Sequence, residues 1–106
     1  MFLTNVELYT KLNELNDEGK RLCVITTNAI QDYTLMRLLD AYGITWMSGT
    51  RLLDELKSVG TSEILAYYFN MTEQGDFRLT YLEFYSKDSL ERYKRDEGDN
   101  IVFMEF

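Results

Sequence analysis

An unbroken apolar run, Leu-Cys-Val-Ile at residues 22–25, most constrains what this chain can fold into. The run lies within the β-rich segment 21–27 and follows the turn-forming residues 16–20, in which Gly19 can end a helix. Because polar and apolar residues do not alternate in it, the run predicts a strand in the centre of a sheet. Cys23 is the only cysteine of the chain, and we expect it to be a buried apolar side chain in a protein of a reducing compartment.

A helix and a second strand are predicted to follow. Asn28 or Thr27 can cap a helix that Gly43 ends, and residues 44–47 form the next strand candidate. The core-facing stripe of this helix comprises Gln31, Leu35, Leu38, Leu39 and Tyr42. Three charged residues are expected mostly off the stripe, namely Asp32, Arg37 and Asp40. Residues 21–47 therefore predict a β-α-β unit, with two parallel strands joined by a right-handed crossover.

Three further helices are predicted, over residues 5–17, 50–59 and 87–98. Thr4 and Glu7 fit a capping box, in which the hydroxyl and the carboxylate satisfy N–H groups at the start of the first helix. Asp88 or Ser89 is the expected cap of the last. The helix over residues 50–59 is expected to be short.

The remaining segments favour strands. Residues 64–71 and 77–85 are rich in β-forming residues and are joined by a loop of hairpin length, so they should pair antiparallel. Residues 101–106 predict a last strand. The consecutive aromatics Tyr67, Tyr68 and Phe69 must send at least one ring to the second face of the sheet, where either the first helix covers it or a partner docks.

The predicted fold class is α+β (mixed α/β). Residues 1–106 are expected to form a single domain, with an N-terminal helix over residues 1–19 and an α/β core over residues 21–106. The core is a small mixed sheet containing one β-α-β unit, an antiparallel hairpin and a C-terminal strand, packed by two main helices. A chain of 106 residues buries roughly two-thirds of its unfolded surface, and so requires no disulfide or metal.

Composition excludes several classes of function. The net charge of −7 disfavours direct nucleic-acid binding, because phosphate recognition requires a concentrated basic surface. The absence of His disfavours zinc sites and catalytic triads, and we expect no metal, no cofactor and no catalytic residue. No signal peptide and no apolar run of about 20 residues is evident, which predicts a cytoplasmic protein without membrane association. The expected partner is a protein of the host or of the phage, and the formation of a homo-oligomer stays open.

One motif carries a resemblance to a known group of proteins. Residues 43–49 read Gly-Ile-Thr-Trp-Met-Ser-Gly and stand among a helix closed by Gly, an aromatic hairpin and a final apolar strand. This pattern resembles small uncharacterised bacteriophage and prophage proteins that share the motif G-(Y/I)-x-W-x-S-G, over roughly residues 21–106. The resemblance implies a phage-encoded accessory protein that works in the bacterial host cytoplasm, where such proteins often block a defence nuclease or capture its nucleotide signal.

The ends of the two strands of the predicted β-α-β unit form a candidate ligand site. Because parallel strands end at the same edge of a sheet, the segments 26–28 and 48–51 should meet there, each at the start of a helix. The candidate ligand-binding residues are Thr27, Asn28, Ser48, Gly49, Thr50 and Arg51. Helix N–H groups, hydroxyls and the Arg51 guanidinium would suit a nucleotide-like anion. The same residue types favour helix caps and tight turns, and this structural interpretation is preferred.

Acidic residues and the single tryptophan form a candidate partner surface. The candidate residues are Trp46, Asp54, Glu55, Glu91, Asp96, Glu97 and Asp99. An acidic face would steer and orient binding to a basic groove, such as that of a nuclease. Basic residues interleave with the acidic ones, which favours an ordinary solvated surface instead. Trp46 is expected to be a core residue or a pocket wall.

These observations lead to three hypotheses about function. The first is a small acidic accessory protein of phage type that acts without catalysis by binding and inhibiting a host factor, with a defence nuclease as the example, in an anti-defence or anti-CRISPR-like role. The second is a binder that sequesters a nucleotide-like anion at the 26–28/48–51 loop edge. The third is a structural protein that assembles through its sheet edge.

Overall fold

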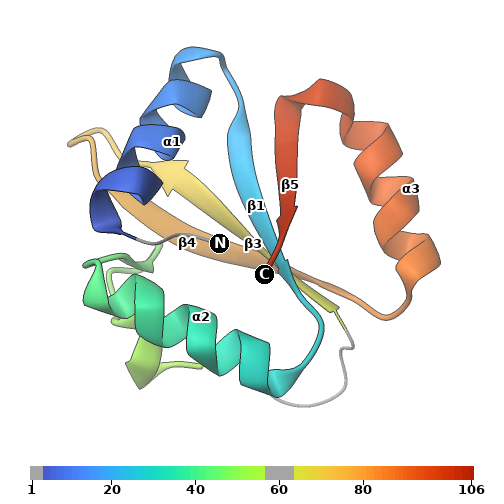
Figure 1. Cartoon of the computed structure of the whole chain (residues 1–106), viewed down its shortest axis with the longest axis horizontal. Coiled ribbons are helices and arrows are strands. Elements are labelled where there is room, and N and C mark those ends of the chain that lie inside the picture. Colours follow the sequence, from blue (N-terminus) through green and yellow to red (C-terminus); the bar gives the residue numbers. More distant parts are fainter. Residues whose placement is uncertain (1–3, 57–63) are drawn as a thin grey trace.

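A five-stranded mixed sheet organises the computed structural model, which describes residues 4–56 and 64–106 (Figure 1). Its strands are β1 Arg21–Thr26, β2 Thr45–Trp46, β3 Ile64–Met71, β4 Phe77–Phe84 and β5 Ile101–Glu105. They lie in the order β2-β4-β3-β1-β5. β3 pairs antiparallel with β1 and β4, whereas β5 is parallel to β1 and β2 is parallel to β4. The predicted α+β class, the hairpin and the last strand are confirmed.

Helices cover both faces of this sheet. α1 (Asn5–Asp17) and α2 (Ala29–Ala41) pack on one face, and α3 (Lys87–Glu97) packs on the other (Figure 1). The apolar run in β1 serves both cores: Leu22 and Val24 join the cluster under α1 and α2, whereas Cys23 and Ile25 join the cluster under α3. The prediction of a central strand is confirmed, since β1 lies between β3 and β5.

Two crossovers connect parallel strands through helices. In the first, β1 leads through α2 to β2, and in the second β4 leads through α3 to β5. The crossovers run in opposite directions across the sheet and on opposite faces, so both have the same hand, as the right-handed rule requires. The parallel direction predicted for β1 and β2 is confirmed, although β3 and β4 lie between them.

Each helix begins at a side-chain cap. Thr4, Asn28 and Ser86 each accept a hydrogen bond from the N–H three residues later, at 3.1, 2.8 and 3.2 Å. The caps predicted for α1 and α2 are therefore confirmed, whereas the prediction of Asp88 or Ser89 for α3 is wrong by two or three positions. Gly43 closes α2 at φ +83°, a conformation that glycine adopts without strain.

The prediction of a helix over residues 50–59 is wrong for residues 50–56. Residues 52–54 form only a short 3₁₀ turn, η1 (Leu52–Asp54), and residues 57–59 lie outside the described residues. Trp46 N–H donates to Thr50 O at 3.0 Å, and Thr45 forms a β-bridge with Arg51. This β-type pairing holds Arg51 in an extended conformation, which prevents a helix from starting there.

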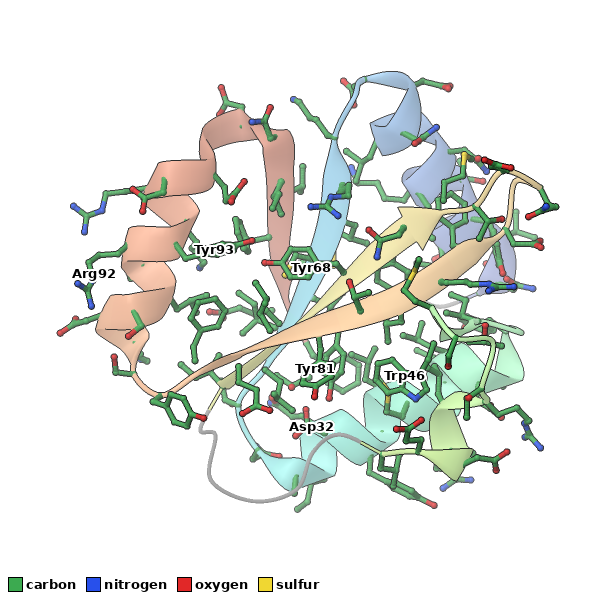
Figure 2. The ribbon with its side chains drawn as sticks, turned by 180° about the vertical axis from the view of Figure 1, so that it is seen from behind. Asp32, Trp46, Tyr68, Tyr81, Arg92 and Tyr93 are labelled. Atoms are coloured by element: carbon green, nitrogen blue, oxygen red, sulfur yellow. The ribbon has the colours of Figure 1, made fainter. Side chains whose placement is uncertain are left out.

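The consecutive tyrosines of β3 divide between the two faces as alternation requires. Tyr67 and Phe69 are buried in the cluster under α1 and α2, and Tyr68 is buried in the cluster under α3. Tyr93 of α3 lies 6.4 Å from Tyr68 between ring centroids (Figure 2). α3 therefore covers the second face, in place of the first helix or a docked partner.

The capping assignment of α3 can be tested by substitution. Ser86→Ala should lower the free energy of unfolding by about 1 kcal/mol, because the Ser89 N–H loses its acceptor. Ser86→Asn should restore most of it, and Asp88→Asn, as the control, should cost less than Ser86→Ala. Urea denaturation followed by circular dichroism measures all three. An unchanged stability in Ser86→Ala would contradict the assignment.

Candidate functional site

The two loops predicted to form an anion site lie apart from each other. Residues 27–28 follow β1 and residues 48–51 follow β2, and these two strands point the same way. β3 and β4 lie between them, so three spacings of about 4.8 Å, roughly 14 Å, separate the two strands sideways. Their ends are also offset along the sheet: Trp46 lies opposite Leu79, whereas Thr26 aligns through β3 with Glu83, four residues further along β4. The structure does not bring Thr27 and Asn28 together with Ser48, Thr50 and Arg51.

The polar groups of the first loop serve α2. Thr27 donates from its N–H and its hydroxyl to Gln31 Oε1, at 2.8 and 3.2 Å. Asn28 Oδ1 accepts from the Gln31 N–H. These contacts fit the structural interpretation, in which the two residues organise the start of a helix.

The second loop is likewise organised by local contacts. Ser48 and Thr50 share a hydrogen bond of 3.0 Å between their hydroxyls, and Gly49 lies at φ +89° in the turn between them. The guanidinium of Arg51 forms an ion pair with Asp40, with 2.8 Å between Nη2 and Oδ2. The positive charge expected to hold an anion therefore already faces a carboxylate.

An open groove beside Trp46 is the feature of this region best suited to binding. It has a volume of about 390 Å³ and is lined by Trp46, Met47, Leu79 and Tyr81 together with Ser48, Thr80 and Glu55. We call it the Trp46 groove. Its wall is mainly aromatic and aliphatic, and Figure 2 shows Trp46 and Tyr81 beside each other.

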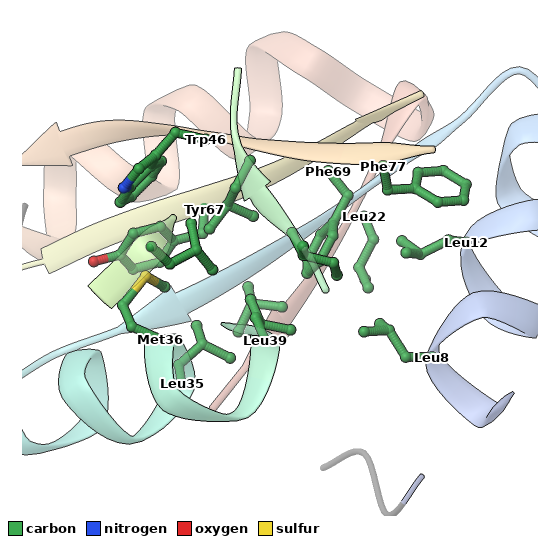
Figure 3. Packing of buried hydrophobic residues seen from close by; sticks show 14 of the residues in the cluster. Leu8, Leu12, Leu22, Leu35, Met36, Leu39, Trp46, Tyr67, Phe69 and Phe77 are labelled. Carbon is green, nitrogen blue, oxygen red and sulfur yellow. The ribbon is translucent and has the colours of Figure 1, made fainter. Parts of the chain in front are cut away.

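Trp46 is held rigidly in the wall of this groove. Its side chain is only 5% exposed, and Nε1 donates to Glu55 O at 2.8 Å. The indole ring contacts Tyr81 and Tyr67 at centroid distances of 6.0 and 6.3 Å, with Tyr67 on the core side (Figure 3). The prediction that Trp46 is a core residue or pocket wall is therefore confirmed.

The short β2 strand produces this open edge. β2 pairs with only two residues of β4, Arg78 and Leu79. Met47 continues from it with an N–H bond to Leu79 O at 3.2 Å, and its carbonyl accepts from Arg78 Nη1 at 3.0 Å. The Met47 side chain is 46% exposed at the rim of the groove, where a partner could reach it.

The acidic candidate residues fall into two separate groups. Asp54 and Glu55 are exposed in and after η1, and Glu55 lines the Trp46 groove. The other group lies on α3 and in the turn after it, on the opposite side of the sheet: Glu91, Asp96, Glu97 and Asp99. The candidates therefore do not form one acidic face (Figure 1).

A buried carboxyl group, which the sequence does not reveal, lies at the start of α2. Asp32 is only 5% exposed and accepts hydrogen bonds from the buried hydroxyls of Thr26 and Tyr67, the latter at 3.2 Å. Burial raises the pKa of Asp32, and the two hydrogen bonds oppose that rise without cancelling it. The expectation that Asp32 lies off the core-facing stripe is wrong, because the hydroxyls of two strands supply it with partners inside.

Among residues 4–56 and 64–106, no three Cys, Asp or Glu side chains come together as a metal site. Over the same residues, no helix has the length and apolar character needed to cross a membrane.

Comparison with known proteins identifies no relative. No protein-family model matches the chain, and no curated protein sequence and no solved structure shows significant similarity to it.

The buried carboxyl group predicts an unusual pH dependence. A folded-state pKa above the unfolded value of about 3.9 means that the contribution of Asp32 to stability is greatest below that pH and falls as the pH rises through the folded pKa. Asp32→Asn keeps an acceptor oxygen and removes the charge. The free energy of unfolding of the wild type relative to Asp32→Asn should therefore decrease from pH 3 to pH 7.

Urea denaturation at several pH values measures this difference. Asp32→Ala should lose about 2–4 kcal/mol at all of them, because two buried hydroxyls lose their acceptor. A wild-type advantage over Asp32→Asn that grows with pH would contradict the account.

Proposed function

We propose that this protein acts without catalysis, by binding and inhibiting another protein, and that the Trp46 groove receives an apolar side chain of that partner. The observation that carries the proposal is the combination of a preformed aromatic groove with acidic residues at its rim. Interfaces concentrate their binding energy in such fixed aromatic positions, which lose little side-chain entropy on binding.

The contacts of Trp46 support its role as a fixed surface for a partner. Its indole N–H is already bonded within the chain and its ring is packed against Tyr67 and Tyr81. No side chain would have to be ordered at this wall when a partner binds. The exposed Met47 beside it is a flexible thioether that can adapt to the shape of an incoming apolar group.

The charges around the groove favour a partner with basic residues. Glu55 lines it and Asp54 precedes Glu55, and both are exposed; among the described residues no Lys or Arg lines it, and the chain carries a net charge of −7. Complementary charge speeds association and orients the two surfaces. A host nuclease, whose nucleic-acid groove is basic, is the example of such a partner that the resemblance to phage proteins favours.

The alternative of an anion binder at residues 26–28 and 48–51 has less support. The two loops are separated by two strands, and the only cation among the candidates, Arg51, is paired with Asp40. A structural protein that assembles through the sheet edge is the third proposal, and no contact within the described residues favours it over the first.

A matched pair of methionine variants tests the proposed surface. Met47 and Met71 are 46% and 40% exposed, and only Met47 lines the Trp46 groove. In capture from bacterial lysate followed by mass spectrometry, Met47→Ser should lose the partner that the wild type recovers, because the apolar contact is removed. Met71→Ser should recover it at the wild-type level. Loss in both variants, or in neither, would contradict the groove as the interface.

A second pair of variants tests the charges. Asp54→Asn with Glu55→Gln should slow association with the purified partner and weaken its dependence on salt, because exposed charges act mainly on encounter. Asp96→Asn with Glu97→Gln on α3 removes the same charge from the opposite side and should change association much less. Stopped-flow measurement of Trp46 fluorescence follows both. Equal effects of the two pairs would show that net charge, and not this rim, attracts the partner.

A further inference from the structure

The outer side of β4 is open along most of the strand. β4 pairs with β3 over all eight of its residues, whereas β2, on its other side, reaches only Arg78 and Leu79. β2 is also the last strand of the sheet in this direction. Within residues 4–56 and 64–106, no strand therefore pairs with the outer side of residues 80–84, and we call this stretch the β4 edge. An unpaired edge of this kind is a template for a strand of another chain.

Tyr81 directs its backbone N–H and C=O to this open side. Successive residues of a strand direct these groups alternately to its two sides. The carbonyl of Leu79 points outward, because it accepts from the Met47 N–H at 3.2 Å. The backbone of Tyr81, two residues later, points the same way, whereas Thr80 and Leu82 point to β3. Within the described ranges, no loop, no turn and no strand on the outer side bonds to the Tyr81 backbone.

The Trp46 groove opens directly onto the β4 edge. Leu79, Thr80 and Tyr81 all line it, although consecutive residues of a strand point to opposite faces of the sheet. Three consecutive residues can line one groove only where it reaches the edge of their strand. A strand laid beside β4 beyond the end of β2 would therefore place one of its side chains in the Trp46 groove.

Exposed apolar side chains accompany this edge on the other face. Leu82 of β4 is 42% exposed, and Tyr85, directly after β4, is 62% exposed. Met47, at the end of the groove, is exposed as well. A strand added here would remove all three from water, which is the main driving force for association.

We infer that the partner contributes an extended segment, which adds to the sheet as a new edge strand beside residues 80–84 and places an apolar side chain in the Trp46 groove. The inference rests on the proposed function, because it names the form in which the partner occupies that groove. In such strand additions, backbone hydrogen bonds give affinity and pockets for alternate side chains give specificity. At about 3.4 Å per residue, about five extended residues cover the β4 edge.

The surroundings of the edge define the chemistry of this segment. The residues before and after the one in the groove point to the opposite face, where Leu82 is exposed, so apolar β-branched residues suit these positions. Basic residues suit its ends, because Glu55 lines the groove and the chain carries a net charge of −7. The peptide acetyl-Lys-Thr-Val-Leu-Val-Thr-Lys-amide has this pattern and serves as the probe.

Hydrogen exchange measured by NMR tests the open edge and its occupation. In the free protein, the Tyr81 amide should exchange faster than those of Thr80 and Leu82, which bond to β3. Titration of the peptide into the ¹⁵N-labelled protein should move the Tyr81 signal to saturation. At a peptide concentration about ten times its Kd, exchange of the Tyr81 amide should slow about tenfold, because only the free protein exchanges there.

A modified peptide and a pair of variants provide the controls. The same peptide with N-methyl groups on Leu and on the following Val carries a methyl group on both of its edges. It should bind at least about tenfold more weakly, since its backbone hydrogen bonds are blocked. Leu82→Ser should weaken binding of the unmodified peptide about fivefold, and Met71→Ser, at a position of similar exposure away from the edge, should leave it unchanged.

Four outcomes would each overturn the inference. The Tyr81 amide of the free protein could exchange as slowly as that of Leu82, or the peptide at millimolar concentration could move no signal of the β4 edge. The N-methylated peptide could bind as well as the unmodified one. Finally, the Tyr81 signal of the free protein could shift with protein concentration, which would assign the edge to a second copy of the chain.

The titration requires no captured partner, so the two proposals fail separately. Peptide binding at the β4 edge without any partner captured from lysate would reject the inhibitory function and leave the strand-addition site in place. Capture that depends on Met47, together with a peptide that leaves Tyr81 exchange unchanged, would keep the groove as the interface and reject strand addition.

Discussion

The burial of β1 on both faces is the constraint on which the rest of the structure depends. Leu22 and Val24 require cover from α1 and α2, and Cys23 and Ile25 require it from α3. Complete burial of one large aliphatic side chain contributes about 1.5–3 kcal/mol, so neither face can be left in water without losing much of the stability of a small domain. The chain satisfies both faces with two crossovers of the same hand, each skipping two strands.

Two cavities follow from this arrangement. The first crossover delivers β2 to the far edge of the sheet, where it pairs for only two residues and leaves the Trp46 groove open beside β4. β3 also remains with β4 after it has left β1, and a second cavity, of about 250 Å³, lies beside that gap.

The helix ends could be predicted from the sequence because they depend on local signals. Side-chain caps at Thr4 and Asn28 and the stop at Gly43 act over a few residues, and the structure contains all three. Strand order depends on contacts between distant segments, which periodicity does not encode, so the separation of residues 27–28 from residues 48–51 could not be foreseen. The burial of Asp32 could not be predicted for the same reason. Its hydrogen-bond partners, Thr26 and Tyr67, belong to two strands, and the sequence alone shows only an acidic residue in the first turn of a helix. Trp46 was recognisable as a wall, but the other residues of its groove come from the hairpin.

The central claim is that the partner binds at the Trp46 groove, and hydrogen–deuterium exchange of the complex tests it most directly. Protection of amides on binding should be concentrated in residues 46–55 and 79–81, which line and flank the groove. α3, which carries the other acidic group on the opposite side of the sheet, should exchange as in the free protein. Protection confined to residues 87–97, with the groove unchanged, would contradict the account.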